Sequence, residues 1–221
     1  NWKVDVAGLK KAVDDFDGFS IVYFVNPNNP TSTVTPASEI DPWVRSKPDN
    51  TLFIADEAYA EYVSDPNFKS MANLIQDGLD NVVLLKTFSK LYAMAGMRVG
   101  FAVGAPAIIK MMKDQVAGEK LNYPGVAAAL VSLDDEPFQE YSRASNLESR
   151  KILASCFDKL GVKYLPSSTN FMFFELNEPI RAFQEKMAAR NILVGRPFPP
   201  AMNWCRISLG TPQEMATLQM N

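Results

Sequence analysis

Three unbroken apolar runs, rich in β-branched and aromatic residues, constrain the fold of this chain more than any other feature. They occupy residues 20–25 (SIVYFV), 51–55 (TLFIA) and 82–86 (VVLLK), and a fourth short strand is predicted at 99–103. Runs that lack the alternation of a half-exposed strand are typical of strands covered on both faces. Helical patterns lie between them, so the sequence predicts a layered α/β fold with a mostly parallel sheet.

Helical periodicity marks the segments between these strands. An apolar stripe predicts a helix over residues 6–16. Thr35 is expected to cap the next helix, with Pro36 at its first position. Two more helices are predicted over residues 107–116 and 125–133.

The pattern changes after Pro137, where a second domain is expected. A long helix is predicted over residues 138–160, with Gly161 at its C-terminal cap. The later predicted elements are strands at 171–176, 192–194 and 205–209, a helix at 179–190 and a last helix after Thr211-Pro212. We therefore expect a large domain over residues 1–136 and a small α+β domain over 137–221.

The chain of 221 residues contains no histidine. This excludes the Ser-His-Asp triad, the Cys-His pair and the HExxH zinc site. The two cysteines, Cys156 and Cys205, show no metal-ligand spacing, so we expect reduced core thiols and no metal site. Chemistry must then come from Lys, Asp, Glu, Tyr, Ser, Thr or Arg side chains, alone or with a cofactor.

The charge balance argues against two classes of partner. With 22 basic and 25 acidic residues the net charge is −3. The chain therefore lacks the excess of positive charge that would favour binding to nucleic acid. No apolar run approaches the roughly 20 residues of a membrane helix. The sequence opens without an initiator Met or a targeting segment, and we expect part of a longer, cytoplasmic protein.

Polar side chains follow the three long apolar runs at the point where each predicted strand ends. In chain order they are Asn29, then Asp56 and Tyr59, then Thr87, Ser89 and Lys90. In open α/β sheets the ligand crevice lies outside the carboxyl ends of the strands. These side chains are therefore expected to gather around one ligand.

Lys90 is the centre of this set. A lysine can form a Schiff base with an aldehyde, and an aspartate such as Asp56 can keep a pyridine nitrogen protonated. Tyrosine and asparagine can bind a phenolate oxygen, while hydroxyls and an arginine such as Arg98 can bind a phosphate. Together these groups match pyridoxal phosphate.

Each residue also has an ordinary structural explanation. Asp56 could cap a helix, Glu57 could be a salt-bridge partner and Asn29 could serve a turn. Lys90 and Arg206 could be solvated surface charges. The coincidence of the whole set at the strand ends favours the functional interpretation.

Four motifs with matching order and spacing carry a family resemblance. They are NPNNPT at 26–31, ADEAY at 55–59, TFSKLYAMAGMRVG at 87–100 and CRISLGT at 205–211. The chain resembles the fold-type I pyridoxal-phosphate aminotransferases of class I/II, histidinol-phosphate aminotransferase-like branch. The resemblance implies a three-layer large domain with a mostly parallel sheet, a small C-terminal α+β domain, and a homodimer with its active site at the interface.

The resemblance also implies a role for each candidate residue. Lys90 resembles the Schiff-base lysine that later moves the substrate proton, and Asp56 the partner of the pyridine nitrogen. The remaining cofactor ligands would be Tyr59 and Asn29 at the phenolic oxygen and Thr87, Ser89 and Arg98 at the phosphate.

Two arginines are candidates for substrate binding. Arg206 resembles the arginine that pairs with the substrate α-carboxylate, since a bidentate fork suits a planar anion. Arg196 lies on a predicted loop, where it could meet a substrate phosphate or carboxylate or be a solvated charge. The substrates implied by the resemblance are an amino donor and a 2-oxo acid.

The chain also departs from the family pattern. Ser32 stands where the family usually has glycine, which should alter the loop but spare Asn29. The family's N-terminal segment, with a glycine-rich phosphate loop, a ring-stacking aromatic and a tyrosine lent across the dimer, is not in this sequence. A non-catalytic fragment that lacks the phosphate loop is therefore one alternative to an aminotransferase. A decarboxylase or lyase on the same scaffold is another, because the same electron-sink chemistry serves several reactions.

Overall fold

The computed structural model describes residues 2–46, 48–116 and 121–219 of the chain. Two compact units are present, and each is described by itself. The first comprises Asn1–Pro27 and Val34–Asp135, and the second comprises Asn28–Thr33 and Glu136–Asn221. The outermost positions of the two predicted domains, 1 and 220–221, lie outside the described residues.

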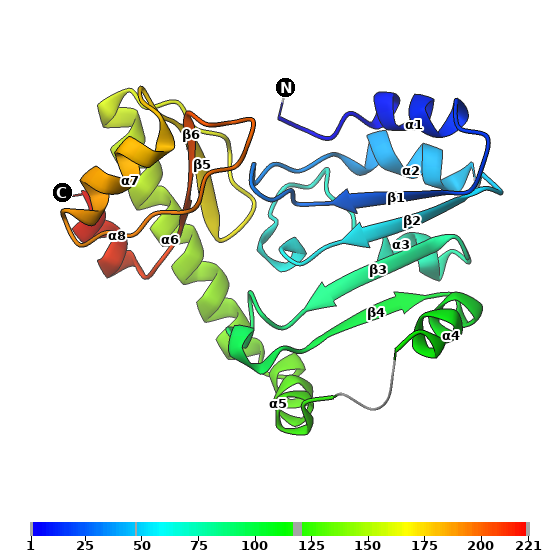
Figure 1. Ribbon diagram of the computed structural model, residues 1–221. Helices are drawn as coiled ribbons and strands as arrows, with labels where there is room; N and C mark the ends of the chain where they lie inside the picture. The colour runs from blue at the N-terminus through cyan, green and yellow to red at the C-terminus, as the bar shows by residue number, and fades with distance from the viewer. Residues whose placement is uncertain (1, 47, 117–120, 220–221) are drawn as a thin grey trace. The chain divides into compact units, whose positions relative to one another are not determined.

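The first unit is built on a four-stranded sheet with the order β1-β2-β3-β4 (Figure 1). Its strands are β1 (Ser20–Val25), β2 (Thr51–Asp56), β3 (Val82–Thr87) and β4 (Gly100–Gly104). The first three are parallel, as predicted, and β4 runs antiparallel to β3. The sheet is therefore mixed, although parallel pairs predominate.

Helices α1 (Val6–Asp14), α2 (Ala37–Arg45) and α3 (Ala72–Gln76) pack on one face of this sheet. The aromatic centre of that core is Trp43, whose ring meets Phe53 edge-on at 5.0 Å between centroids. On the opposite face Ile21 and Tyr23 are 62% and 52% exposed. The described residues thus show two of the three predicted layers, and the third stays a prediction.

The start of α2 differs from the prediction. Pro36, not Thr35, occupies the N-cap position, and no side chain caps the helix. Asn26 explains the difference, because its side-chain amide donates to Thr35 O at 2.9 Å and accepts from Thr35 N at 3.0 Å. These two bonds hold the Thr35 backbone in the loop and exclude it from the helix.

Short elements complete the first unit. They are the 3₁₀ turns η1 (Ala60–Tyr62) and η2 (Ala95–Met97), and the helices α4 (Pro106–Asp114) and α5 (Tyr123–Leu133). Both helices were predicted, whereas α3 and the two 3₁₀ turns were not.

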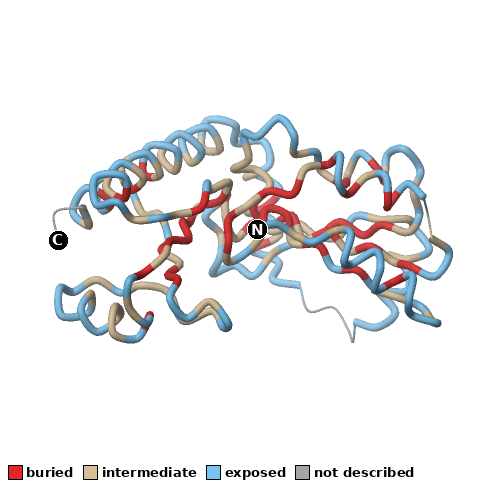
Figure 2. The backbone as a smooth tube through the Cα atoms, turned by 90° about the horizontal axis from the view of Figure 1, so that it is seen from above, coloured by how far each residue is buried: buried red, intermediate tan, exposed pale blue. Residues whose placement is uncertain are grey.

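The second unit packs helices against a two-stranded antiparallel sheet. Its elements are α6 (Glu136–Leu160), β5 (Phe171–Glu175), α7 (Ile180–Ala188), β6 (Trp204–Ser208) and α8 (Pro212–Gln219). Gly161 follows α6 with a φ of +64°, as expected for a C-terminal glycine. Figure 2 shows buried positions (red) concentrated along the strands, while the outer sides of the helices are pale blue.

The predicted strand at 192–194 is wrong. The segment pairs with no strand in the described part of the chain, and its one contact with β6 is made by the adjacent Gly195, whose N donates to Arg206 O at 3.2 Å. Three apolar residues are too few to distinguish a strand from an extended loop. Both cysteines are free; Cys205 is buried, and burial raises the pKa of its thiol to about 12. Within the described residues, no helix has the length and apolar character needed to span a membrane.

Candidate active site

A pocket lies at the carboxyl ends of β2 and β3 in the first unit. Its lining comes from the ends of these strands and from the segment around η2: Asp56, Ala58, Leu85, Lys86, Thr87, Ser89, Lys90, Ala95 and Arg98. Asp56, Thr87, Ser89, Lys90 and Arg98, all candidates from the sequence, therefore share one pocket.

Lys90 and Tyr59 lie next to each other at this site. The Lys90 Nζ is 5.2 Å from the centroid of the Tyr59 ring, which is buried. Among the described residues, no hydrogen bond or ion pair engages the Lys90 ammonium. An amine that need not break an ion pair is well suited to bond covalently to a ligand.

Asp56 is held through both carboxylate oxygens. Its Oδ1 accepts a hydrogen bond from Ala58 N at 3.0 Å, and its Oδ2 accepts one from the Tyr23 hydroxyl at 2.5 Å. Partial burial, the hydrogen bond to Asp56 and the charge of that carboxylate together raise the pKa of Tyr23 to about 12. The first contact closes a turn and is not the helix cap considered from the sequence, since Tyr59 is the N-cap residue of η1. The second contact fixes the plane of the carboxylate.

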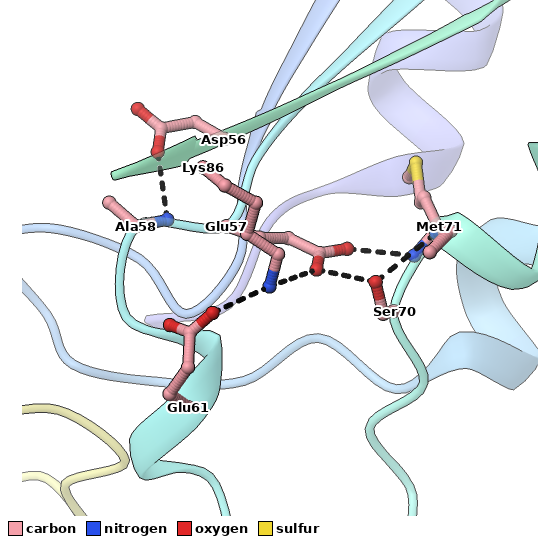
Figure 3. A network of polar contacts seen from close by, with 8 residues as sticks. Asp56, Glu57, Ala58, Glu61, Ser70, Met71 and Lys86 are labelled. Carbon is pink, nitrogen blue, oxygen red and sulfur yellow. Dashed lines mark hydrogen bonds and ion pairs between the residues drawn. The ribbon is translucent and has the colours of Figure 1, made fainter. Parts of the chain in front are cut away.

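A second charged group lies beside the pocket (Figure 3). The Lys86 Nζ is 3.1 Å from Glu57 Oε2 and 3.0 Å from Glu61 Oε1. We call Glu57, Lys86 and Glu61 the charge cluster. Burial alone would lower the pKa of Lys86, but the charges and hydrogen bonds of the two carboxylates outweigh it and raise that pKa. The salt-bridge role considered for Glu57 is confirmed.

Thr87, Ser89 and Arg98 provide the polar groups on the β3 side of the pocket. The Thr87 hydroxyl donates to Ser89 Oγ at 2.9 Å and accepts from Ser89 N at 3.1 Å. Arg98 is exposed and donates from Nη1 to Ala95 O at 2.8 Å. Its φ of 54° and ψ of 48° are left-handed, a conformation that costs a non-glycine residue roughly 1–2 kcal/mol. Such strain is concentrated at functional sites.

Two other candidates meet in the second unit. Arg206 on β6 donates from Nη1 to Asn29 Oδ1 at 2.9 Å, and its guanidinium carbon is 5.0 Å from the centroid of the Phe171 ring. The Arg206 Nε is buried and has no hydrogen-bond partner among the described residues. The stacking fixes the guanidinium plane, and the unused donor leaves capacity to bind an anion.

Arg196 shares an aromatic ring with Arg206. The guanidinium carbons of Arg196 and Arg206 are 4.4 Å and 5.2 Å from the centroid of the Phe198 ring. Arg196 is exposed, as expected for a loop residue. Two cationic groups on one ring can receive two anionic groups, or two parts of one anion.

The loop that carries Asn29 is closed by its own backbone. Asn28 N donates to Thr33 O at 2.9 Å, and Ser32 N donates to Asn28 O at 2.8 Å. Ser32 is buried and has a φ of 60°, in the left-handed region that favours glycine. The structure thus gives a backbone reason for glycine at this position, although serine occupies it here.

Sequence reasoning missed Tyr23 and the full charge cluster. Tyr23 stands two residues before Val25, which pairs in register with Asp56, so strand alternation places Tyr23 on the same face as Asp56. The alternation can be read from the sequence, but the register that aligns Val25 with Asp56 comes from the structure. For Lys86 the signal was a charged residue at the end of an otherwise apolar strand.

Comparisons with known proteins show the family to which the chain belongs. The family model described as aminotransferase class I and II matches residues 1–219. A histidinol-phosphate aminotransferase 2 from Legionella pneumophila (strain Lens) is 33% identical over 216 residues, covering 97% of this chain and 58% of the relative. The chain therefore spans a little over half the length of that curated relative.

Two crystal structures show the same fold. One, from Erwinia carotovora atroseptica and provisionally assigned as a histidinol-phosphate aminotransferase, is 56% identical with a TM-score of 0.97, covering 100% of this chain and 64% of the other. The histidinol-phosphate aminotransferase from Sinorhizobium meliloti, in complex with pyridoxal-5'-phosphate, is 27% identical with a TM-score of 0.88, covering 98% and 59%. This chain belongs to the aminotransferase class I and II family and is similar to its histidinol-phosphate aminotransferase branch.

Proposed function

We propose that the protein containing this chain is a pyridoxal-phosphate-dependent aminotransferase that moves an amino group between an amino acid or related amine and a 2-oxo acid. The observation that carries the proposal is the pocket lined by Lys90, Asp56, Thr87, Ser89 and Arg98. Its Lys90 ammonium has no hydrogen bond or ion pair to any residue that the structure describes. Family membership supports the same activity.

The side chains present fit the cofactor in their chemistry. Lys90 offers an amine for the aldehyde and Asp56 a carboxylate for the pyridine nitrogen, while Thr87, Ser89 and Arg98 offer donors for the phosphate. When bound, pyridoxal phosphate supplies an electron sink for the bonds at the substrate α-carbon. Tyr59 and Asn29 are proposed as donors to its phenolic oxygen, an assignment that rests on the motifs.

The chain's own residues would then do three things. Asp56, fixed by Tyr23 and Ala58, would keep a proton on the pyridine nitrogen. Lys90 Nζ would carry a proton to and from the substrate α-carbon. Arg206 would bind the substrate carboxylate, and its bond to Asn29 Oδ1 would couple substrate binding to the asparagine proposed to touch the cofactor.

We further propose that residues 1–136 form the C-terminal part of a large cofactor-binding domain and 137–221 a small domain. Arg196 is proposed as a second substrate anchor beside Arg206. The resemblance also leads us to propose a cytoplasmic homodimer with its active site at the subunit interface.

The test uses the full-length protein incubated with pyridoxal phosphate. Reduction with borohydride followed by peptide mass spectrometry should place the label on Lys90. Formation of a 2-oxo acid from an amino donor, with exchange of the substrate α-proton, would establish transamination. Release of carbon dioxide instead would identify a decarboxylase, and a folded full-length protein that takes no label would refute the cofactor assignment.

A further inference from the structure

The Glu57 carboxylate is buried and fully engaged, yet it has no part in the proposed chemistry. The residue is 2% exposed. Its Oε1 accepts from Met71 N at 2.7 Å, and its Oε2 accepts from Ser70 Oγ at 2.6 Å besides pairing with Lys86 (Figure 3). A buried ion pair is weak evidence for added stability, because desolvation opposes the attraction between the charges. Its presence here needs another explanation.

The location of the charge cluster supplies one. Glu57 directly follows Asp56, and Lys86 directly precedes Thr87, so the ion pair joins the two segments that line the pocket. Glu57 N also donates to Leu85 O at 3.1 Å, which extends the pairing of β2 and β3 beyond Asp56. In Figure 3 the Asp56 and Glu57 side chains point away from each other, Asp56 toward the Ala58 backbone and Glu57 toward Ser70, Met71 and Lys86.

We propose that the charge cluster is a positioning device that fixes Asp56 relative to the segment bearing Thr87, Ser89 and Lys90. This inference rests on the proposed function, in which Asp56 binds the pyridine nitrogen of the cofactor. The charge cluster then sets where that nitrogen lies relative to the Lys90 amine. Neither Glu57 nor Lys86 touches the reacting atoms. Both act through the backbone of the catalytic residues beside them.

The two carboxylates also keep Lys86 out of the chemistry. Glu61 gives the cluster one negative charge more than it has positive ones, and both carboxylates reach the same ammonium. Lys86 contributes to the pocket lining, but strand alternation places its side chain with those of Val82 and Leu84, and it meets Glu57 on the helix-covered face of the sheet, opposite to Asp56. The ion pairs hold the Lys86 ammonium on that face, so Lys90 is the lysine with an amine available to the pocket.

A positioning role can be separated from a purely stabilising one. Removing one charge of a buried pair leaves the other unpaired and destabilises the fold, whereas replacing both with uncharged groups of similar size is often neutral. The Glu57→Gln/Lys86→Met double variant therefore removes the buried ion pair, and the carboxylate that loses its partner is that of Glu61, which is more exposed than Glu57. Lys86→Arg keeps the charge, and the exposed pair Lys110→Met/Asp114→Asn is the matched control.

The experiment uses the full-length protein with three readouts. Thermal unfolding measures stability, and a fluorescence titration of the cofactor-free protein measures the Kd for pyridoxal phosphate. Amide hydrogen exchange, also on the cofactor-free protein, follows peptides covering residues 55–62 and 86–91. The last readout requires neither activity nor bound cofactor.

The double variant is expected to unfold near the wild-type temperature, to bind pyridoxal phosphate about tenfold more weakly, and to exchange faster in both peptides. Its kcat should fall on the order of 10²-fold, as expected for displacement of a catalytic group by about 1 Å. Lys86→Arg, which keeps the charge between the two carboxylates, should change the Kd and the exchange rates less than the double variant does, and the control pair should change none of the readouts.

A double variant with wild-type Kd and wild-type exchange in both peptides would overturn the proposal. If the double variant does not fold, Glu57→Gln, which keeps the side-chain shape, decides by the same two readouts. Failure of the proposed function would look different. The wild-type protein would then take no borohydride label, while the exchange data would still report whether the cluster orders the two segments.

Discussion

Two adjoining regions at the ends of β2 and β3 use the same kinds of side chain in opposite ways. In the charge cluster every ionised group is paired, with Lys86 between two carboxylates. In the pocket the Lys90 ammonium has neither a hydrogen bond nor an ion pair to any described residue. Lys86 has its partners within the protein and serves the structure, whereas Lys90 is left to bind a ligand.

The largest expected effect concerns the two lysines. Lys90→Ala should abolish borohydride labelling and lower turnover at least about 10³-fold, because both the covalent anchor and the proton carrier are lost. Peptide mass spectrometry and steady-state kinetics on the full-length protein measure the two losses. Lys86→Arg is the matched control and should keep the label. A label on Lys86 in the wild type would show that Lys86, and not Lys90, bonds to the cofactor.

The next largest difference is expected between substitutions of the adjacent carboxylates Asp56 and Glu57. Asp56→Asn should retain pyridoxal phosphate but lose turnover by about 10²–10³-fold, because a neutral amide cannot stabilise a protonated pyridine nitrogen. Absorbance spectra of the bound cofactor and kcat provide the measurement. Glu57→Gln should instead change thermal stability and hydrogen exchange more than the spectrum. Full turnover in Asp56→Asn would leave Asp56 with only its turn role.

The third comparison is between two arginines of the second unit, Arg206 and Arg150. Arg206→Lys should raise KM for amino acids on the order of 10²-fold, because lysine loses the two-pronged donor set that fixes a carboxylate. Arg150, which donates to Thr169 O at 2.9 Å, is the structural counterpart, and Arg150→Lys should affect stability and leave KM unchanged. Amines without a carboxylate should be indifferent to Arg206→Lys. An equal rise in KM for both substrate types would remove Arg206 as the carboxylate anchor.

The smallest effect is expected at Tyr23. Its pKa, raised to about 12, means that the hydrogen bond to Asp56 is intact below the ordinary tyrosine pKa of 10.0 and is lost as the pH rises through about 12. Tyr23→Phe should remove one late step from the phenolate absorbance titration and lower kcat about threefold to tenfold. Tyr164, which donates to Asp158 Oδ1 at 3.1 Å, gives the control variant Tyr164→Phe with unchanged kcat. An identical titration curve in Tyr23→Phe would refute the assignment.

Much of the first unit was predictable because continuous apolar runs and turn residues are local signals. The three parallel strands and the pocket at their carboxyl ends follow from that pattern and a general rule for α/β sheets. The direction of β4 was not predictable, since a short apolar strand reads the same in parallel and antiparallel pairing. Thr35 was misplaced because the interaction that removes it from the helix comes from Asn26, outside the capping pattern.

Contacts between segments that are distant in the sequence limited how much of the site could be predicted. Arg206 and Asn29 are 177 residues apart in the sequence, and no spacing rule connects them. The motifs singled out both residues, but only the fold shows that one donates to the other. The charge cluster is similar, because Glu57 finds its partners on β3 and just before α3.

Residues Asn28–Thr33 belong to the second unit, although the segments on either side belong to the first. The chain therefore passes between the units three times, after Pro27, after Thr33 and after Asp135. Recombination that exchanged residues 136–221 as one block would replace Arg206 and leave Asn29 behind with an unfamiliar partner. The C-terminal segment 136–221 is thus constrained to evolve together with the six residues 28–33, which are encoded far upstream.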